Sequence, residues 1–213
     1  VCDNGVVIAE NTTWSKANSP YFVGCNLAVD QGVTLTIEPG VTVYIDTMKQ
    51  IIIDGELIAN GTEGDTIIFK NNLEYFKRSN FITINYGNDT INRGNLFDQI
   101  YFRPNAKGNF SYFKIEDAIY GSYIENDSIN FQNGIIQNCI YGVQLLNSSS
   151  IISNVLFNNN DNTGVSGYNT NYLNVYNSEF SDNENGIKLT GVVDNSQISI
   201  SGNNFFNNEQ DIY

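Results

Sequence analysis

The second half of the chain repeats itself, and this repeat constrains the fold more than any other feature. A large apolar residue opens each repeat, a glycine follows it six or seven positions later in all but the last, and short apolar runs lie before and after. The opening residues are Ile115, Ile136, Phe157, Phe180 and Phe205. Their spacings of 21, 21, 23 and 25 residues fall in the range of solenoid proteins. Each repeat therefore predicts one coil of three short strands joined by turns.

The stacking of one coil on the next explains why the same residue types recur. A lone coil cannot bury its inward side chains, whereas stacked coils share one continuous core. We therefore expect Phe157 to stack on Phe180, with Ile136 below them and Phe205 above. Three positions before the opening residue stand Asn133, Asn154 and Asn177. Stacked asparagine amides can hydrogen-bond to one another, and asparagine accepts the left-handed backbone of a tight turn.

The first half of the chain reads as coils of the same kind. Apolar residues alternate with threonine from Tyr21 to Ile45, and Glu38-Pro39-Gly40 forms a predicted turn. A further coil is expected over residues 51–69. Residues 1–20, with Trp14, are expected to form an irregular cap over the open end of the solenoid.

Several runs resemble a known superfamily. They are Trp14 with Ser19-Pro20-Tyr21, Gly32-Val-Thr-Leu-Thr-Ile-Glu-Pro-Gly-Val-Thr-Val43 and Gly55-Glu-Leu-Ile-Ala-Asn-Gly-Thr62. They resemble the opening coils of secreted right-handed parallel β-helix proteins of the pectin-lyase-like superfamily, and the later Phe-x-x-Asn rows resemble its parallel β-helix repeats. Together these stretches cover most of the chain. The resemblance implies an all-β, single-stranded, right-handed parallel β-helix. The superfamily holds lyases, hydrolases, epimerases, adhesins and surface-layer proteins, so it implies no single activity.

We expect one domain of about eight coils over residues 1–213, with regular coils over 101–213. Between residues 70 and 100 the pattern loosens into a coil with loop excursions around one clear strand, Phe81–Ile84. Every arginine lies in or beside this region, together with several aromatic residues: Arg78, Arg93, Arg103, Tyr75, Phe76 and Tyr86. Such a cluster can dock a sugar or a partner chain, or simply pack over the side of the coils.

Charge limits the partners. The chain carries 23 acidic and 10 basic residues, a net charge of −13. This argues against nucleic acids and anionic membrane surfaces, both of which require basic faces. No apolar run approaches the roughly 18 residues of a membrane span. The chain opens at Val1 without methionine, which suggests a cleaved, secreted precursor.

Cysteines and sequons favour an extracellular location. A disulfide between Cys2 and Cys25 would close the first coil, whereas Cys139 reads as a small buried thiol. Six sequons of the form Asn-X-Ser/Thr are candidates for glycosylation, and several fall at predicted turns: Asn11, Asn60, Asn88, Asn109, Asn126 and Asn147.

Candidate catalytic groups are few. The chain has no histidine, which removes histidine-dependent triads, most zinc sites and the histidine motif of the superfamily's pectin hydrolases. Carboxylates for sugar hydrolysis occur at predicted turns as Glu116 with Asp117 and as Asp182 with Glu184, one coil from Asp161. Lys114 and Lys188 are the nearest bases for a calcium-assisted elimination. All read more simply as solvated turn charges, so no catalytic, cofactor or metal residue is expected.

The resulting expectation is a non-enzymatic, structural or adhesive protein at a cell surface. Its partners are expected to be surface glycans or further copies of itself, joined head to tail through open ends of the β-helix. The alternative is a polysaccharide lyase or glycoside hydrolase, acting on an acidic polysaccharide, with its site on the 70–100 excursion and the neighbouring coil face.

Overall fold

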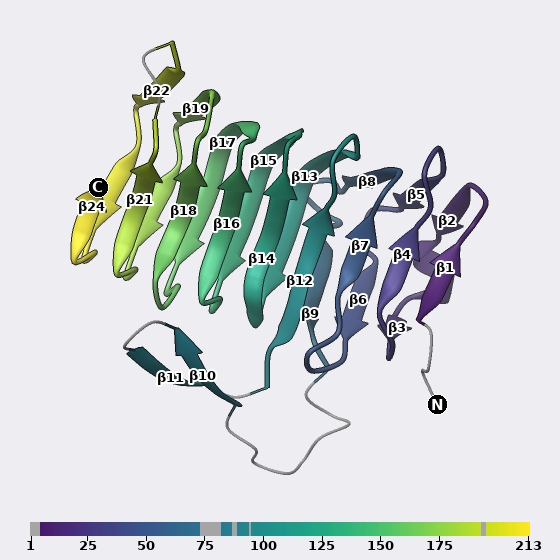
Figure 1. The fold of residues 1–213 in the computed structure, drawn as a ribbon. Coiled ribbons are helices and arrows are strands. Elements are labelled where there is room, and N and C mark those ends of the chain that lie inside the picture. Colours follow the sequence, from purple (N-terminus) through teal and green to yellow (C-terminus); the bar gives the residue numbers. More distant parts are fainter. Residues whose placement is uncertain (1–4, 73–81, 87–88, 94, 193–194) are drawn as a thin grey trace.

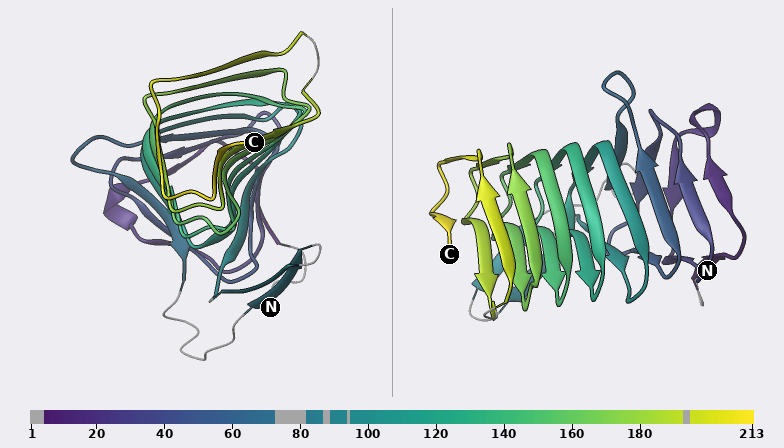
Figure 2. Two further views of the ribbon diagram at one scale, coloured as in Figure 1. Left: turned by 90° about the vertical axis from the view of Figure 1, so that its left-hand side faces the viewer. Right: turned by 90° about the horizontal axis from the view of Figure 1, so that it is seen from above.

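The computed structural model describes residues 5–72, 82–86, 89–93, 95–192 and 195–213, and of 82–86 and 89–93 the backbone alone. The chain winds into a stack of coils whose strands run parallel from one coil to the next (Figure 1). A view along the stack shows the later coils lying almost on top of one another (Figure 2). The prediction of an all-β parallel solenoid of about eight turns is confirmed.

One sheet of nine strands forms the first side of every coil, and we call it sheet A. Each of its strands pairs in parallel with the equivalent strand of the coils before and after it. Its strands, in spatial order, are β1 (Val6–Ile8), β4 (Leu27–Val29), β7 (Ile51–Ile53), β12 (Phe97–Phe102), β14 (Ala118–Glu125), β16 (Tyr141–Leu146), β18 (Thr163–Tyr168), β21 (Asn185–Thr190) and β24 (Gln210–Ile212).

The remaining sides belong to a second network of parallel strands, sheet B. Its main path consists of β2 (Thr12–Trp14), β5 (Thr34–Ile37), β8 (Glu56–Asn60), β13 (Lys107–Glu116), β15 (Ser128–Gln137), β17 (Ser149–Asn158), β19 (Tyr172–Tyr176) and β22 (Gln197–Ser201). Its third-side strands are β3 (Tyr21–Val23), β6 (Thr42–Ile45), β9 (Ile67–Asn71), β20 (Glu179–Ser181) and β23 (Asn204–Phe206).

The middle coils differ from the expected three separate strands. In β13, β15 and β17 the second and third strands of the coil merge into single strands of 10 residues. Asn133 and Asn154 lie within two of these strands with φ of 52° and 54°. A single left-handed residue therefore bends the strand at the corner and lets the ladder resume at once.

The interior is a column of apolar side chains in register. Ile115, Ile136, Phe157, Phe180 and Phe205 are paired from coil to coil. The Phe157 and Phe180 rings stack with centroids 4.9 Å apart and planes 5° apart, and Phe180 stacks on Phe205 at the same distance. The period of the sequence repeat thus equals one lap of the coil.

Asparagines occupy three corners of the coil, where the sequence indicated one. Asn154 donates its side-chain N–H to the Oδ1 of Asn133 at 3.1 Å. Equivalent bonds join Asn159 to Asn138 at 2.8 Å and Asn169 to Asn147 at 3.2 Å. All of these residues, and Asn177 with them, have positive φ. Amide ladders therefore connect consecutive coils at each corner.

A further asparagine column lies inside the solenoid. Asn160 donates to Asn183 Oδ1 at 2.9 Å, and Asn183 donates to Asn208 Oδ1 at 2.9 Å. Asn160 and Asn183 are 1% and 3% exposed. Asn183 also donates to the carbonyl oxygen of Phe157 at 3.1 Å, so its buried amide is bonded to both the ladder and the backbone. The buried Cys139 precedes Asn160 in this column, and its N–H donates to the Asn160 Oδ1 at 3.1 Å.

Two expectations about irregular regions need correction. Residues 1–20 were expected to form an irregular cap, but within them β1 and β2 already pair in parallel with β4 and β5 and so belong to the first coil. The excursion was expected to hold one strand, but β10 (Ile82–Tyr86) and β11 (Asp89–Arg93) form an antiparallel hairpin. This hairpin lies outside the stack of coils (Figure 1). Cys2 lies outside the described residues, so its disulfide with Cys25 stays a prediction.

Candidate binding face

The outer face of sheet A carries a group of tyrosines on three neighbouring strands. In β12, Ile100 and Phe102 are fully buried, so Tyr101 between them points outward. Tyr123 pairs in register with Tyr101 and occupies the same outward position in β14. The preceding and following outward positions in this row are Ile52 and Gln144. We call Tyr101, Tyr120, Tyr123 and Tyr141 the tyrosine face.

The four rings contact one another edge to face and face to face. Tyr101 and Tyr123 meet edge-on with centroids 5.3 Å apart, and Tyr120 meets Tyr123 in the same way at 5.5 Å. Tyr120 and Tyr141 stack at 5.0 Å with planes 13° apart. Tyr141 is buried at 7% exposure and packs with Leu96, Ile119 and Ile140, whereas the other three tyrosines are partly exposed. The result is a cluster of contacting aromatic rings across three coils, partly exposed on the two coils of β12 and β14.

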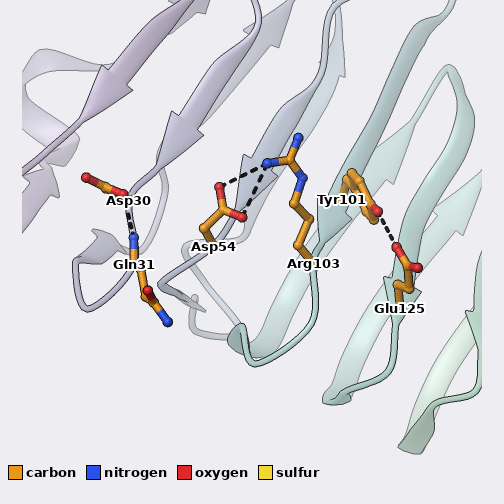
Figure 3. Close-up of polar contacts among 6 residues, drawn as sticks. All are labelled: Asp30, Gln31, Asp54, Tyr101, Arg103 and Glu125. Atoms are coloured by element: carbon orange, nitrogen blue, oxygen red, sulfur yellow. Dashed lines mark hydrogen bonds and ion pairs between the residues drawn. The ribbon is translucent and has the colours of Figure 1, made fainter.

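Charged groups border the tyrosine face where the strands end. The Tyr101 hydroxyl donates to a carboxylate oxygen of Glu125 (Figure 3). The Arg103 guanidinium lies over the Tyr101 ring, 5.7 Å from its centroid, and forms an ion pair with Asp54 at 3.4 Å. Three successive coils thus place Asp54, then Arg103 with Tyr101, and then Glu125 in a row along the axis.

Burial shifts the acidity of two groups on β12. Burial, reinforced by the hydrogen bond to Glu125 and its negative charge, raises the pKa of Tyr101 to about 12. Burial also raises the pKa of the Asp98 carboxyl above its ordinary value. The Tyr101 hydroxyl is therefore a neutral donor at physiological pH, which fixes the direction of its hydrogen bond.

The carboxylates considered from the sequence lie elsewhere. Lys114 and Glu116 form an ion pair at 2.6 Å on sheet B. Asp161, Asp182 and Glu184 come together with Glu209 around a cavity of about 350 Å³ at a corner of the last coils. Both oxygens of Asp182 already accept from asparagine side chains, at 3.2 Å each.

The remaining sequence candidates are Lys188 and the side chains of the excursion. Lys188 holds its ammonium over the Tyr213 ring at 5.1 Å instead of approaching Asp182. Side chains of the excursion lie outside those the structure describes: Arg78, Arg93, Tyr75, Phe76 and Tyr86.

Within the described ranges, no group of three or more His, Cys, Asp or Glu residues could hold a metal ion. In the same ranges, no helix is long and apolar enough to cross a membrane.

Comparison with known families now adds to this geometry. A family model described as the right-handed beta helix region matches residues 98–212. The chain belongs to this family. The match covers the strands of the tyrosine face, so β12, β14 and β16 are part of the family's repeated coils. No curated protein and no solved structure matches the chain.

The sequence contains a signal for the tyrosine face that its repeats alone do not reveal. The runs Ile100-Tyr-Phe102 and Ser122-Tyr-Ile124 were expected to be strands of this right-handed β-helix. In a strand whose two outer members point inward, the middle residue points outward. The outward column, followed from coil to coil, therefore brings Tyr101 and Tyr123 together on the basis of sequence alone.

Proposed function

We propose that this chain is a non-enzymatic, extracellular adhesive protein that binds saccharide chains on the tyrosine face. The observation that carries the proposal is the register pair Tyr101 and Tyr123, whose rings lie on adjacent coils of a rigid solenoid. The apolar faces of sugar rings pack well on aromatic rings, and sugar hydroxyls require hydrogen-bond partners at the edges of such a platform.

Polar side chains at the edges of the platform support this choice of ligand. Glu125 and Arg103 border Tyr101, and Gln144 follows Tyr123 in the same outward row. On the N-terminal side, Gln99 donates to the side-chain oxygen of Gln50 at 2.9 Å. These groups offer both donors and acceptors, as hydroxyl groups require.

The sequons are compatible with an extracellular, glycosylated protein. The chain buries several asparagines, but those of the five sequons in the described ranges are all exposed: Asn11, Asn60, Asn109, Asn126 and Asn147. Asn88 lies outside those ranges. None of the five belongs to a strand of sheet A. Head-to-tail assembly also stays a prediction, for which sedimentation velocity over a range of concentrations is the measurement.

The proposal is tested by screening immobilised polysaccharides and oligosaccharides for binding. We expect the wild-type protein to retain a saccharide and Tyr123→Ala to bind it about tenfold more weakly, since an aromatic contact contributes about 0.5–1.5 kcal/mol beyond its buried area. Tyr176→Ala is the matched control, because Tyr176 is a partly exposed tyrosine on sheet B. Equal binding by Tyr123→Ala and wild type, with both variants folded, would refute the tyrosine face as the site.

A polysaccharide lyase or glycoside hydrolase is the second candidate. The supporting observation is the raised pKa of Asp98 on the strand that carries Tyr101, because burial that favours the neutral carboxyl is an environment typical of general acids. The same saccharides are incubated with the protein and assayed for new reducing ends and for the ultraviolet absorbance of unsaturated products. If product forms with the wild-type protein and not with Asp98→Asn, the enzymatic function replaces the adhesive one as the proposal.

A further inference from the structure

A pocket lies beside the tyrosine face, at the corner where the chain passes from sheet A to sheet B. The loops that follow β4, β7 and β12 form it, and its volume is about 260 Å³. Six polar side chains line it, and we call it the corner pocket: Gln31, Thr34, Asp54, Glu56, Asn105 and Lys107. The backbones of Gly32, Val33 and Gly55 complete the lining.

The tight packing of three loops creates this pocket. A Cβ on Gly55 would lie 2.2 Å from the carbonyl oxygen of Val33 and 2.3 Å from that of Asp30, so only glycine lets the second loop approach the first. A Cβ on Gly32, which has a φ of 77°, would meet nothing within 4 Å. The loops are therefore in close contact at Gly55, whereas the space beside Gly32 is open.

Donors and acceptors are mixed around the pocket. Thr34, Glu56 and Lys107 occupy the same register position on β5, β8 and β13. The Thr34 hydroxyl donates to Glu56 Oε2 at 3.1 Å, which orients that carboxylate. The charge of Asp54 is offset by Arg103 at 3.4 Å. The remaining charges, those of Glu56 and Lys107, are opposite in sign, so the pocket as a whole is close to neutral.

The same arginine connects the pocket to the tyrosine face. Arg103 contacts Asp54 of the pocket and lies over the Tyr101 ring. Figure 3 shows Asp30, Asp54, Arg103 and Glu125 following one another at the ends of successive sheet A strands. A chain of sugar units bound to Tyr101 would therefore reach the corner pocket by passing a single side chain.

We propose that the corner pocket is a subsite for one uncharged sugar unit of the saccharide that the tyrosine face binds. The inference rests on the proposed function and adds the class of ligand. Hydroxyl groups both donate and accept, which matches a pocket with two carboxylates, two amides, one hydroxyl and one ammonium. A pocket close to neutral offers no excess positive charge to a polyanion, and the net charge of −13 on the whole chain disfavours one.

The experiment measures affinity as a function of oligosaccharide length by titration calorimetry. The probes are neutral β-linked and α-linked oligomers of glucose, mannose and galactose, from disaccharides to hexasaccharides, together with a uronic acid series of the same lengths. The variants are Lys107→Ala and Glu56→Gln, the second of which keeps an acceptor for Thr34. Their matched controls are Lys70→Ala, over the Tyr44 ring on another face, and Glu63→Gln, in an exposed turn.

We expect wild type to bind longer neutral oligomers more tightly than short ones. Both pocket variants should lose about tenfold in affinity for the long oligomers alone, the cost of a charged hydrogen bond. Both controls should bind every length as wild type does. If the pocket variants bind all lengths like wild type while Tyr123→Ala is weakened, the subsite is refuted and the tyrosine face stands. Preference for the uronic acid series would refute the uncharged ligand, and absence of binding by wild type would remove both proposals.

Discussion

Gly142 packs directly against Phe157 in the interior of the solenoid. A Cβ on Gly142 would lie 3.0 Å from Cδ1 of Phe157 and 2.4 Å from the carbonyl oxygen of Gly164 in the next coil. The contact recurs along the stack, since Gly164 meets the Phe180 ring in the same way and Gly186 meets Phe205. The two columns of the repeat, glycine and large apolar residue, are thus complementary surfaces of one core.

Replacing Gly142 by alanine is therefore expected to destabilise the protein strongly. The added methyl group has no room between a ring and a carbonyl oxygen, and overpacking of this kind costs about 1–3 kcal/mol or more. The measurement is the urea midpoint followed by far-ultraviolet circular dichroism. Gly64→Ala is the matched control, because a Cβ there would meet nothing within 4 Å. A Gly142→Ala midpoint as high as that of the control would contradict this packing.

Substitutions of Asn154 test what the corner asparagines contribute to stability. Its φ of 54° is costly for alanine, by about 1–2 kcal/mol, but not for glycine. We expect Asn154→Ala to lower the free energy of unfolding by about 1–2 kcal/mol and Asn154→Gly to lower it by less. Gly202, with a φ of 64°, already occupies the equivalent corner in the last coil. If both variants lose the same stability, the amide bond to Asn133, not the backbone, is the larger contribution.

The coil, its period and the inward column were predictable from sequence because stacking places each repeated residue on its own equivalent. Phe157 and Phe180 recur as residues of one type at one spacing, and that spacing is the length of a coil. The packing of the glycines against the next coil was not predictable, since this close approach depends on the path of the backbone. Only one strand of the β10–β11 hairpin was found from the sequence, because only that strand has an alternating apolar pattern.

The candidate site was harder to predict than the fold. Outward residues do not have to repeat, so Tyr101 and Tyr123 are followed in their row by glutamine, serine and lysine. The corner pocket draws on residues from three coils that are distant in sequence, such as Gln31, Glu56 and Lys107. The register from coil to coil is enough to find the tyrosine face, whereas the pocket requires the conformations of the loops.

Asp98 gives a prediction about stability and pH. Burial raises the pKa of its carboxyl in the folded state, so its ionised form disfavours folding. This cost is absent below the ordinary pKa of 3.8 and grows as pH rises through the folded-state pKa. We therefore expect Asp98→Asn to have a higher urea midpoint than wild type at pH 7. The difference should shrink on acidification, and a constant difference from neutral to acidic pH would contradict the assignment.

The titration of the Tyr101 hydroxyl tests its hydrogen bond to Glu125 without any ligand. Its pKa of about 12, against an ordinary value of 10.0, means that the folded state holds the phenol proton more tightly than the unfolded chain does. Its contribution to stability is therefore complete below pH 10 and is lost as pH rises through about 12. We expect the ultraviolet difference absorbance of phenolate to include one late-titrating tyrosine that disappears in Tyr101→Phe. Glu125→Gln should move that titration to lower pH, because it removes a negative charge beside the hydroxyl, while burial keeps the pKa above the ordinary value. If Glu125→Gln leaves the late titration unchanged, burial alone sets the acidity of Tyr101, and the carboxylate does not hold this hydroxyl in solution.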